Sequence, residues 1–189
     1  MNTIIQSAIE YIKDVFSNDF GGHDVEHSLR VYHNALQIAN TEPTCNLFIV
    51  SIAALLHDVD DHKLFNTVNN ANARLFLHKH QIDEDVIDII CEVINGVSFS
   101  KNRGKLPSTI EGMIVQDADR LDAIGAVGIA RTFAFGGEHN RKLTDTIQHF
   151  YDKLLLLKDE MNTSEGKKIA EYRHQIMVEY LKELKKEMQ

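Results

Sequence analysis

Apolar residues recur along most of the chain at spacings of three and four, which is the period of an amphipathic helix and not of a strand. Residues 2–16, for example, place Ile5, Ile9, Ile12 and Phe16 on one face. Similar patterns predict helices over about 23–40, over a stretch that ends near His57, and over 67–80, 83–95, 108–135, 144–161 and 163–187. Because no segment alternates convincingly with period two, we expect an all-α fold of about eight or nine helices.

Polar and glycine residues mark several of the expected helix ends. Thr67 and Asp83 are expected N-caps, and residues 108–111, Ser-Thr-Ile-Glu, have the form of a capping box. Gly136-Gly137 is expected to stop the helix that begins at 108. The charged run at 182–187 is interpreted as a solvated helix face.

Composition narrows the class of protein. A chain of 189 residues is about one domain, and 43% hydrophobic with 25% charged residues is usual for a globular protein. The formal net charge of -8 argues against nucleic acid and anionic membranes as partners, since both favour a basic surface. It leaves a small anionic ligand possible, because a metal ion and a few cations can reverse the field inside a cleft.

The cysteines and the N-terminus favour a cytoplasmic protein. Cys45 and Cys91 stand far apart in apolar stretches, so free, buried thiols are expected. The first residues, with Glu10 and Asp14, do not resemble a secretory signal, and no apolar run approaches the roughly 20 residues of a membrane span.

The first candidate for chemistry is residues 53–63, Ala-Ala-Leu-Leu-His-Asp-Val-Asp-Asp-His-Lys. An apolar helix runs directly into an imidazole, three carboxylates, a second imidazole and a lysine. Carboxylates beside a buried face are costly unless they are paired or bind a cation. The alternative is that the helix simply ends there and that the acids are solvated.

Two further segments place polar side chains of metal-binding type in apolar surroundings. His27 lies between Val25 and Leu29 and is a candidate to face inwards, and residues 117–122, Asp-Ala-Asp-Arg-Leu-Asp, place three acids in an apolar helix. A cation shared by these segments would offset the cost of burying them, and helical bundles hold metals by side chains from facing helices.

The order His27, His57-Asp58 and Asp119 resembles the H…HD…D signature of the HD-domain metal-dependent phosphohydrolases. The likeness extends over most of the chain and is strongest to a subgroup of stand-alone bacterial proteins, the YpgQ/YedJ-like proteins. It includes residues 22–24 (Gly-His-Asp), 55–58 (Leu-Leu-His-Asp), Asp61 with Lys63, 117–128, 131–133 (Arg-Thr-Phe), 136–137 (Gly-Gly) and 149–155 (His-Phe-Tyr-Asp-Lys-Leu-Leu).

The resemblance implies one HD domain over residues 1–189, with a metal-binding core at about 20–135 and C-terminal helices at about 143–187. It also implies that His27, His57, Asp58 and Asp119 bind one divalent metal ion. Imidazoles with carboxylates suit Mn, Fe, Co or Ni, with Zn and Mg also possible.

The activity implied is hydrolysis of nucleotides, most specifically cleavage of (deoxy)nucleoside triphosphates to a monophosphate and pyrophosphate. The metal would lower the pKa of a water molecule and neutralise charge at phosphorus. Asp61 is the expected general acid/base, and Lys63 a phosphate-binding partner in catalysis. Weaker candidates for the substrate site are His23, Asp24, Arg120, Asp122, Lys101 and Arg103. Arg120 and Lys63 have an equal alternative in ion pairs with neighbouring acids, and Asp122 could orient a metal-bound histidine or pair with Arg120.

Three alternatives stay open. Other HD enzymes are nucleoside monophosphatases or cleave other phosphoesters, and fold analogy does not choose among them. A non-catalytic HD module would sense a nucleotide without cleaving it. A zincin-like site at His23 and His27 is disfavoured because Asp24 stands where the zincin base is Glu. We expect a monomer or homodimer.

Overall fold

The computed structural model describes residues 2–17, 25–62, 64–98, 102 and 104–188. These residues form nine α-helices and one 3-10 helix and contain no strand, so the all-α prediction is confirmed. The helices are α1 (Asn2–Val15), α2 (Val25–Ala39), α3 (Leu47–Leu56), α4 (Ala71–Lys79), α5 (Glu84–Val97), α7 (Ile110–Asp122), α8 (Gly125–Glu138), α9 (Leu143–Asp152), η1 (Leu154–Glu160) and α10 (Ser164–Glu187). Among them, none has both the length and the apolar character that crossing a bilayer requires.

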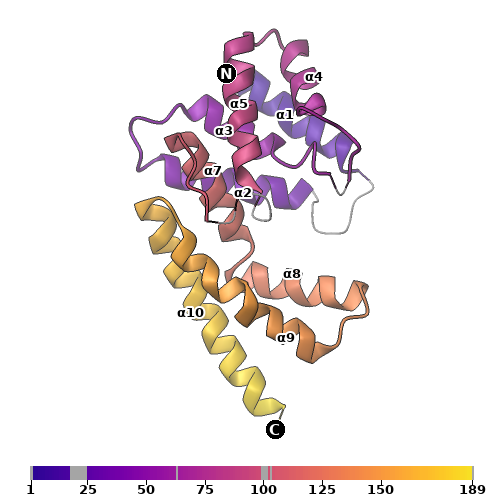
Figure 1. Cartoon of the computed structure of the whole chain (residues 1–189), viewed down its shortest axis with the longest axis vertical. Coiled ribbons are helices and arrows are strands. Elements are labelled where there is room, and N and C mark those ends of the chain that lie inside the picture. Colours follow the sequence, from indigo (N-terminus) through magenta and orange to yellow (C-terminus); the bar gives the residue numbers. More distant parts are fainter. Residues whose placement is uncertain (1, 18–24, 63, 99–101, 103, 189) are drawn as a thin grey trace. The chain divides into compact units, whose positions relative to one another are not determined.

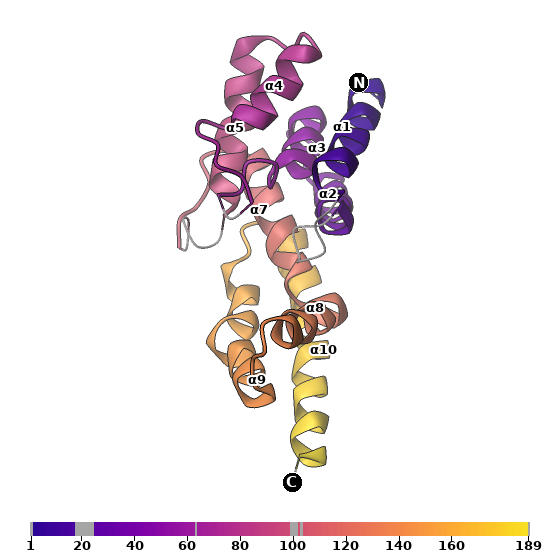
Figure 2. The ribbon, with the colours of Figure 1, turned by 90° about the vertical axis from the view of Figure 1, so that its right-hand side faces the viewer.

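The chain divides into two compact units, Met1–Asp119 and Arg120–Gln189. In the first unit α3 is the central helix, and it packs against α1, α2 and α5 (Figures 1 and 2). Every residue of α3 from Ile49 to Leu56 is buried, which is typical of a helix that is apolar on all sides. The expectation of one domain over 1–189 stays a prediction.

Local chemistry defines both ends of α3. The side chain of Asn46 caps it by accepting the backbone N–H groups of Phe48 and Ile49, at 3.1 and 3.3 Å. After Leu56 the chain leaves the helix, and His57 occupies the C-cap. The polar cluster predicted at 57–61 therefore begins where a fully buried helix ends.

The second unit is built from α8, α9, η1 and α10. The long α10 packs against α8 and η1, and α9 contacts the same two elements (Figures 1 and 2). Phe150, Leu157, Ala170 and Met177 are among the buried residues of these helices. The predicted start of the last helix is confirmed, because the hydroxyl of Thr163 accepts the Gly166 N–H at 3.0 Å.

Two predicted helices are in fact interrupted. The helix expected over 108–135 ends at Asp122 and a new one begins at Gly125, whose φ of +76° lies in the left-handed region that favours glycine. Gly136-Gly137 lies inside α8 and does not stop it. The helix expected over 144–161 breaks at Lys153, which has φ -139° and ψ -60°, and continues as η1.

Two predicted caps are also wrong, whereas Asp83 does occupy the N-cap position of α5, although its side chain makes no capping hydrogen bond. The helix expected to start after Thr67 begins at Ala71, with Asn70 as N-cap. At 108–111, Thr109 caps α7 by accepting the Gly112 N–H at 3.1 Å, and Ser108 instead donates to the Glu92 carboxylate at 2.7 Å. Tertiary partners thus changed which polar residue was available to cap.

Candidate metal centre

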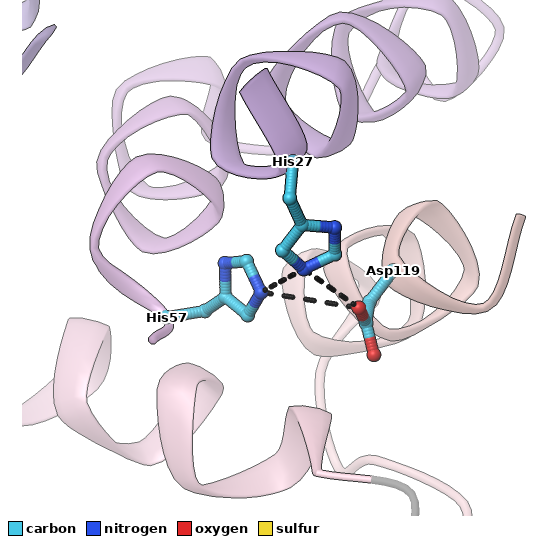
Figure 3. Close-up of side chains that lie close together, drawn as sticks. All are labelled: His27, His57 and Asp119. Carbon is cyan, nitrogen blue, oxygen red and sulfur yellow. Dashed lines mark hydrogen bonds and ion pairs between the residues drawn. The ribbon is translucent and has the colours of Figure 1, made fainter. Parts of the chain in front are cut away.

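Three segments of the first unit bring imidazoles and carboxylates together (Figure 3). His27 lies in the first turn of α2 and is only 4% exposed. His57 and Asp58 follow α3 directly and are buried. Asp119 lies near the end of α7, and its side chain is 23% exposed, so the cluster is most open to solvent at this residue.

The ligand atoms lie within a few ångström of one another. His27 Nε2 is 3.2 Å from His57 Nε2, and these nitrogens lie 3.5 and 3.8 Å from Asp119 Oδ1. Asp58 Oδ2 is 3.3 Å from both nitrogens. The four residues predicted as ligands therefore converge, although His27 and Asp119 are far apart in sequence.

These separations fit a single metal ion. With bonds of about 2.1 Å, neighbouring ligand atoms lie about 3.0 Å apart around an octahedron and about 3.4 Å apart around a tetrahedron. The observed 3.2–3.8 Å lies close to this range. Two imidazole nitrogens with carboxylate oxygens are also the donor types that divalent transition metals prefer. The residues present thus fit the metal ion that the fold implies.

A backbone contact orients His57 for ligation. Its Nδ1 lies 2.9 Å from the carbonyl oxygen of Ala54, one turn earlier in α3. Donation by Nδ1–H to this carbonyl leaves the lone pair of the neutral ring on Nε2, the atom that faces the cluster. The end of α3 therefore sets both the ring orientation and the tautomer.

Electrostatics in the cluster favour positive charge. Burial would lower the pKa of His57, but the neighbouring carboxylates Asp58 and Asp119 outweigh it and raise that pKa to about 9. A group of carboxylates that holds a proton on an imidazole at neutral pH is equally suited to hold a cation. The field is therefore that of a cation site.

Asp61, the predicted general acid/base, is joined to the same turn as the cluster. Its backbone N–H donates to the Asp58 carbonyl at 3.0 Å, and its carboxylate lies 3.5 Å from His62 Nδ1. Lys63, grouped with Asp61 as catalytic, lies outside the described residues, as do the weaker substrate candidates His23, Asp24, Lys101 and Arg103.

Arg120 and Asp122, the remaining candidates, are buried and form ion pairs with partly exposed residues of the second unit. Arg120 donates to the Glu160 carbonyl and lies 3.6 Å from the Glu160 carboxylate. Asp122 accepts a hydrogen bond from Arg131. Ion pairing was the alternative that the sequence left open for both, and Asp122 pairs with Arg131.

Sequence reasoning missed the residues that support the cluster. Asn34 lies two turns after His27 and donates to the Ala118 carbonyl at 3.2 Å, which ties α2 to α7 beside Asp119. Asn72 donates its backbone N–H to the Asp60 carboxylate and its side-chain amide to the Val59 carbonyl, next to the turn that carries His57 and Asp58. The spacing of seven between His27 and Asn34 was a usable signal, whereas nothing in the sequence paired Asp60 with Asn72.

Comparisons with known proteins identify the family to which this chain belongs. The sequence profile of the HD domain matches residues 24–124. The chain is 41% identical to the Bacillus subtilis protein YpgQ over 187 residues, which cover 94% of this chain and 90% of YpgQ. The crystal structure of YpgQ in complex with ADP superposes with a TM-score of 0.83 at 36% identity and covers 97% of each chain.

A second structural relative is an HD-superfamily hydrolase from Bacillus thuringiensis. It has a TM-score of 0.82 and 37% identity, and it covers 99% of this chain and 97% of its own. The matched profile spans more than half of the sequence and includes His27, His57, Asp58 and Asp119. The chain therefore belongs to the HD-domain family and is a metal-dependent phosphohydrolase of the HD superfamily.

Proposed function

We propose that the chain hydrolyses nucleotides, and specifically that it cleaves (deoxy)nucleoside triphosphates to a monophosphate and pyrophosphate. The observation that carries the metal-dependent part is the convergence of His27, His57, Asp58 and Asp119. The nucleotide part is supported by YpgQ, which binds ADP in its crystal structure and is 36% identical to this chain in that comparison.

The four proposed ligands together bind one divalent ion. His27 and His57 supply Nε2 atoms, and Asp58 and Asp119 supply carboxylate oxygens. The bound metal lowers the pKa of water and neutralises negative charge on phosphate oxygens. Because the donors combine imidazole and carboxylate, we propose one divalent ion from the set Mn, Mg, Co, Ni and Fe, with Zn as a further candidate.

Asp61 is the proposed acid/base. Its place in the turn after Asp58 keeps a carboxylate close in sequence to two ligands, and that carboxylate lies 3.5 Å from His62 Nδ1. At neutral pH a carboxylate accepts the proton of a water molecule and later returns it to the leaving phosphate. Lys63 is proposed to bind phosphate.

A nucleotide panel tests the proposal. Purified protein is incubated with Mn²⁺, Mg²⁺ or Co²⁺ and each nucleoside and deoxynucleoside mono-, di- and triphosphate, and the products are separated by ion-exchange chromatography. Monophosphate with pyrophosphate supports the proposal. Diphosphate with phosphate, or nucleoside with phosphate, moves the activity to another phosphohydrolase class. Reaction in ¹⁸O-water locates the attacked phosphorus, because the label enters the monophosphate or the pyrophosphate.

Matched variants separate this activity from a contaminant. Asp119→Asn changes one proposed ligand with little change in shape and is expected to lower turnover by at least about 100-fold. Asp159→Asn makes the same change at an exposed carboxylate and is expected to leave turnover within about twofold of wild type. Tight nucleotide binding without any cleavage under every metal would favour the sensing module.

A further inference from the structure

We infer that Asp60 and Asn72 form a clasp that positions the metal-binding turn, and this inference rests on the proposed metal site. The Asp60 Oδ1 atom accepts the backbone N–H of Asn72 at 3.0 Å. The side-chain amide of Asn72 donates in return to the Val59 carbonyl at 2.7 Å. Each residue thus holds the backbone of the other's segment.

The clasp also serves as the cap of α4. Asn70 is the N-cap residue of that helix, but its backbone is left-handed, with φ 53°, and its side chain makes no capping bond. Asp60 supplies the cap from a separate segment, because its Oδ2 accepts the Ala73 N–H at 3.0 Å while Oδ1 accepts that of Asn72. Its negative charge is favourable at the positive end of the helix.

The α4 end of the clasp is itself anchored. The hydroxyl of Tyr11 on α1 donates to the Asn72 carbonyl at 3.3 Å, and the Tyr11 ring stacks on Phe76 of α4 with centroids 5.0 Å apart. The side-chain amide of Asn70 donates to the Cys91 carbonyl on α5 at 3.4 Å. Helices α1 and α5 therefore hold the start of α4 in place.

The other end of the clasp is the metal-binding turn. Asp60 lies two residues after the proposed ligand Asp58 and directly before Asp61, and Val59 between them is fully buried. The turn is closed by N–H bonds from Val59 to Leu56 and from Asp61 to Asp58, at 3.2 and 3.0 Å. Because Asn72 and Ala73 of α4 hold Val59 and Asp60, the backbone of this turn cannot move Asp58 away from His27 without breaking the clasp.

Accordingly, Asp60 and Asn72 act as positioning residues, and neither needs to touch metal or substrate. Small errors in ligand placement are costly, and outer partners of metal ligands typically contribute 10–100-fold in affinity. The Asn72→Ala variant removes the bond to Val59 but leaves the Asp60 carboxylate and its charge intact. It therefore tests position separately from electrostatics.

The experiment compares Asp60→Ala and Asn72→Ala with Asn46→Ala as matched control. Asn46 also caps a helix through two backbone N–H groups, but it does so at the start of α3, ten residues from the end that carries His57. Mn²⁺ affinity is measured by the loss of the free Mn²⁺ EPR signal on titration, and urea denaturation measures the stability of each variant. Hydrogen exchange over residues 57–62 reports the turn directly.

We expect both clasp variants to raise the Kd for Mn²⁺ by about tenfold and to speed exchange over 57–62. We expect Asn46→Ala to lower the urea midpoint while the Kd stays within about twofold of wild type. In turnover, kcat should fall more than KM changes.

Equal Kd values in clasp and control variants, after correction for stability, would overturn the positioning role while leaving the proposed function intact. If Asp60→Ala raises the Kd and Asn72→Ala does not, charge and not position is the cause, and the inference fails. Wild-type protein that binds no Mn²⁺ would refute the proposed metal site itself, and the clasp would lose its role with it.

Discussion

The ion pair between Asp122 and Arg131 allows a prediction about the stability of the second unit. Asp122 is 1% exposed and accepts a hydrogen bond from Arg131, whose side chain is 31% exposed. Arg173 interacts electrostatically with Asp122. Burial lowers the pKa of Arg173, and the negative charge of Asp122 partly offsets this decrease. Arg173 also donates to the Leu121 carbonyl at 2.6 Å. Asp122 thus provides negative charge for two guanidinium groups.

Asp122→Ala is therefore expected to destabilise the protein. Removing one partner of a buried pair usually costs 3–5 kcal/mol, and because Arg131 keeps partial access to water we expect about 3 kcal/mol. Arg131→Ala should cost less, about 2 kcal/mol, because Arg173 still offsets the charge of Asp122. The coupling energy in the double-mutant cycle should be about 2 kcal/mol.

Urea denaturation followed by circular dichroism measures these free energies. Hydrogen exchange over α8 and α10 shows whether the loss is local to the second unit. The matched control is Glu171→Ala, which removes an exposed ion pair with Lys158 of 3.1 Å and should cost under about 1 kcal/mol.

The nucleotide KM separates the structural role of Asp122 from its predicted role in the substrate site. We expect KM to stay within about twofold of wild type at a temperature where the variant is folded. A loss of stability no larger than that of Glu171→Ala would refute the buried-pair reasoning, and a raised KM at unchanged stability would favour the substrate role.

Three further predictions concern the metal cluster and pH. Asn34→Ala removes the bond to the Ala118 carbonyl and should cost about 1 kcal/mol of stability and weaken Mn²⁺ binding several-fold. The control Gln116→Ala removes a bond from α7 to α5 and should cost a similar amount of stability without changing the Mn²⁺ affinity. Equal Mn²⁺ affinities in the two variants would contradict the role of Asn34. Mn²⁺ at 100 times its Kd should raise the free energy of unfolding by about 2.7 kcal/mol, and EDTA should reverse this increase. In His57→Ala, Mn²⁺ should not stabilise the protein. Full stabilisation of that variant by Mn²⁺ would point to a zincin-like site instead. Burial, together with nearby cations, lowers the pKa of His149 below 6.5. Its contribution to stability is therefore present above pH 6.5 and is lost as the pH falls through the pKa of the folded state. As the pH is lowered, the urea midpoint should fall less steeply for His149→Gln than for wild type.

Most of the helical pattern could be read from the sequence because periodicity reports burial directly. The starts of α1, α5 and α10 were predicted within a residue or two, and α3 was recognised as the core helix that leads into the polar cluster. Errors fell where a backbone conformation or a distant partner decided the outcome. Gly125 adopts a left-handed φ where one helix ends and the next begins. Asn70, and not Thr67, is the N-cap residue of α4.

The cost of burying carboxylates beside apolar helices marked the acidic segments as candidates for a cation site, but the four proposed ligands were named from the resemblance to the H…HD…D signature. Sequence could not pair residues that meet only once separate elements have packed together, since the partners carry no shared periodicity. Asp60 with Asn72, Asn34 with the Ala118 carbonyl and Asp122 with Arg131 are all of this kind. For Arg120 the sequence left phosphate contact and an ion pair equally open, and for Asp122 it left open a metal-bound histidine or Arg120 as partner. Only the fold supplied Glu160 and Arg131 as partners.

The sequence by itself determined an all-α chain with acidic segments that need a counter-charge, because helix period and the cost of burying charge are local properties; the HD domain and its ligand set followed from the family resemblance. Only the tertiary structure decided that His27, His57, Asp58 and Asp119 converge within 3.2–3.8 Å of the imidazole nitrogens, and which neighbours hold them there. Such convergence depends on how α2, α3 and α7 pack, and packing is a property of many side chains at once.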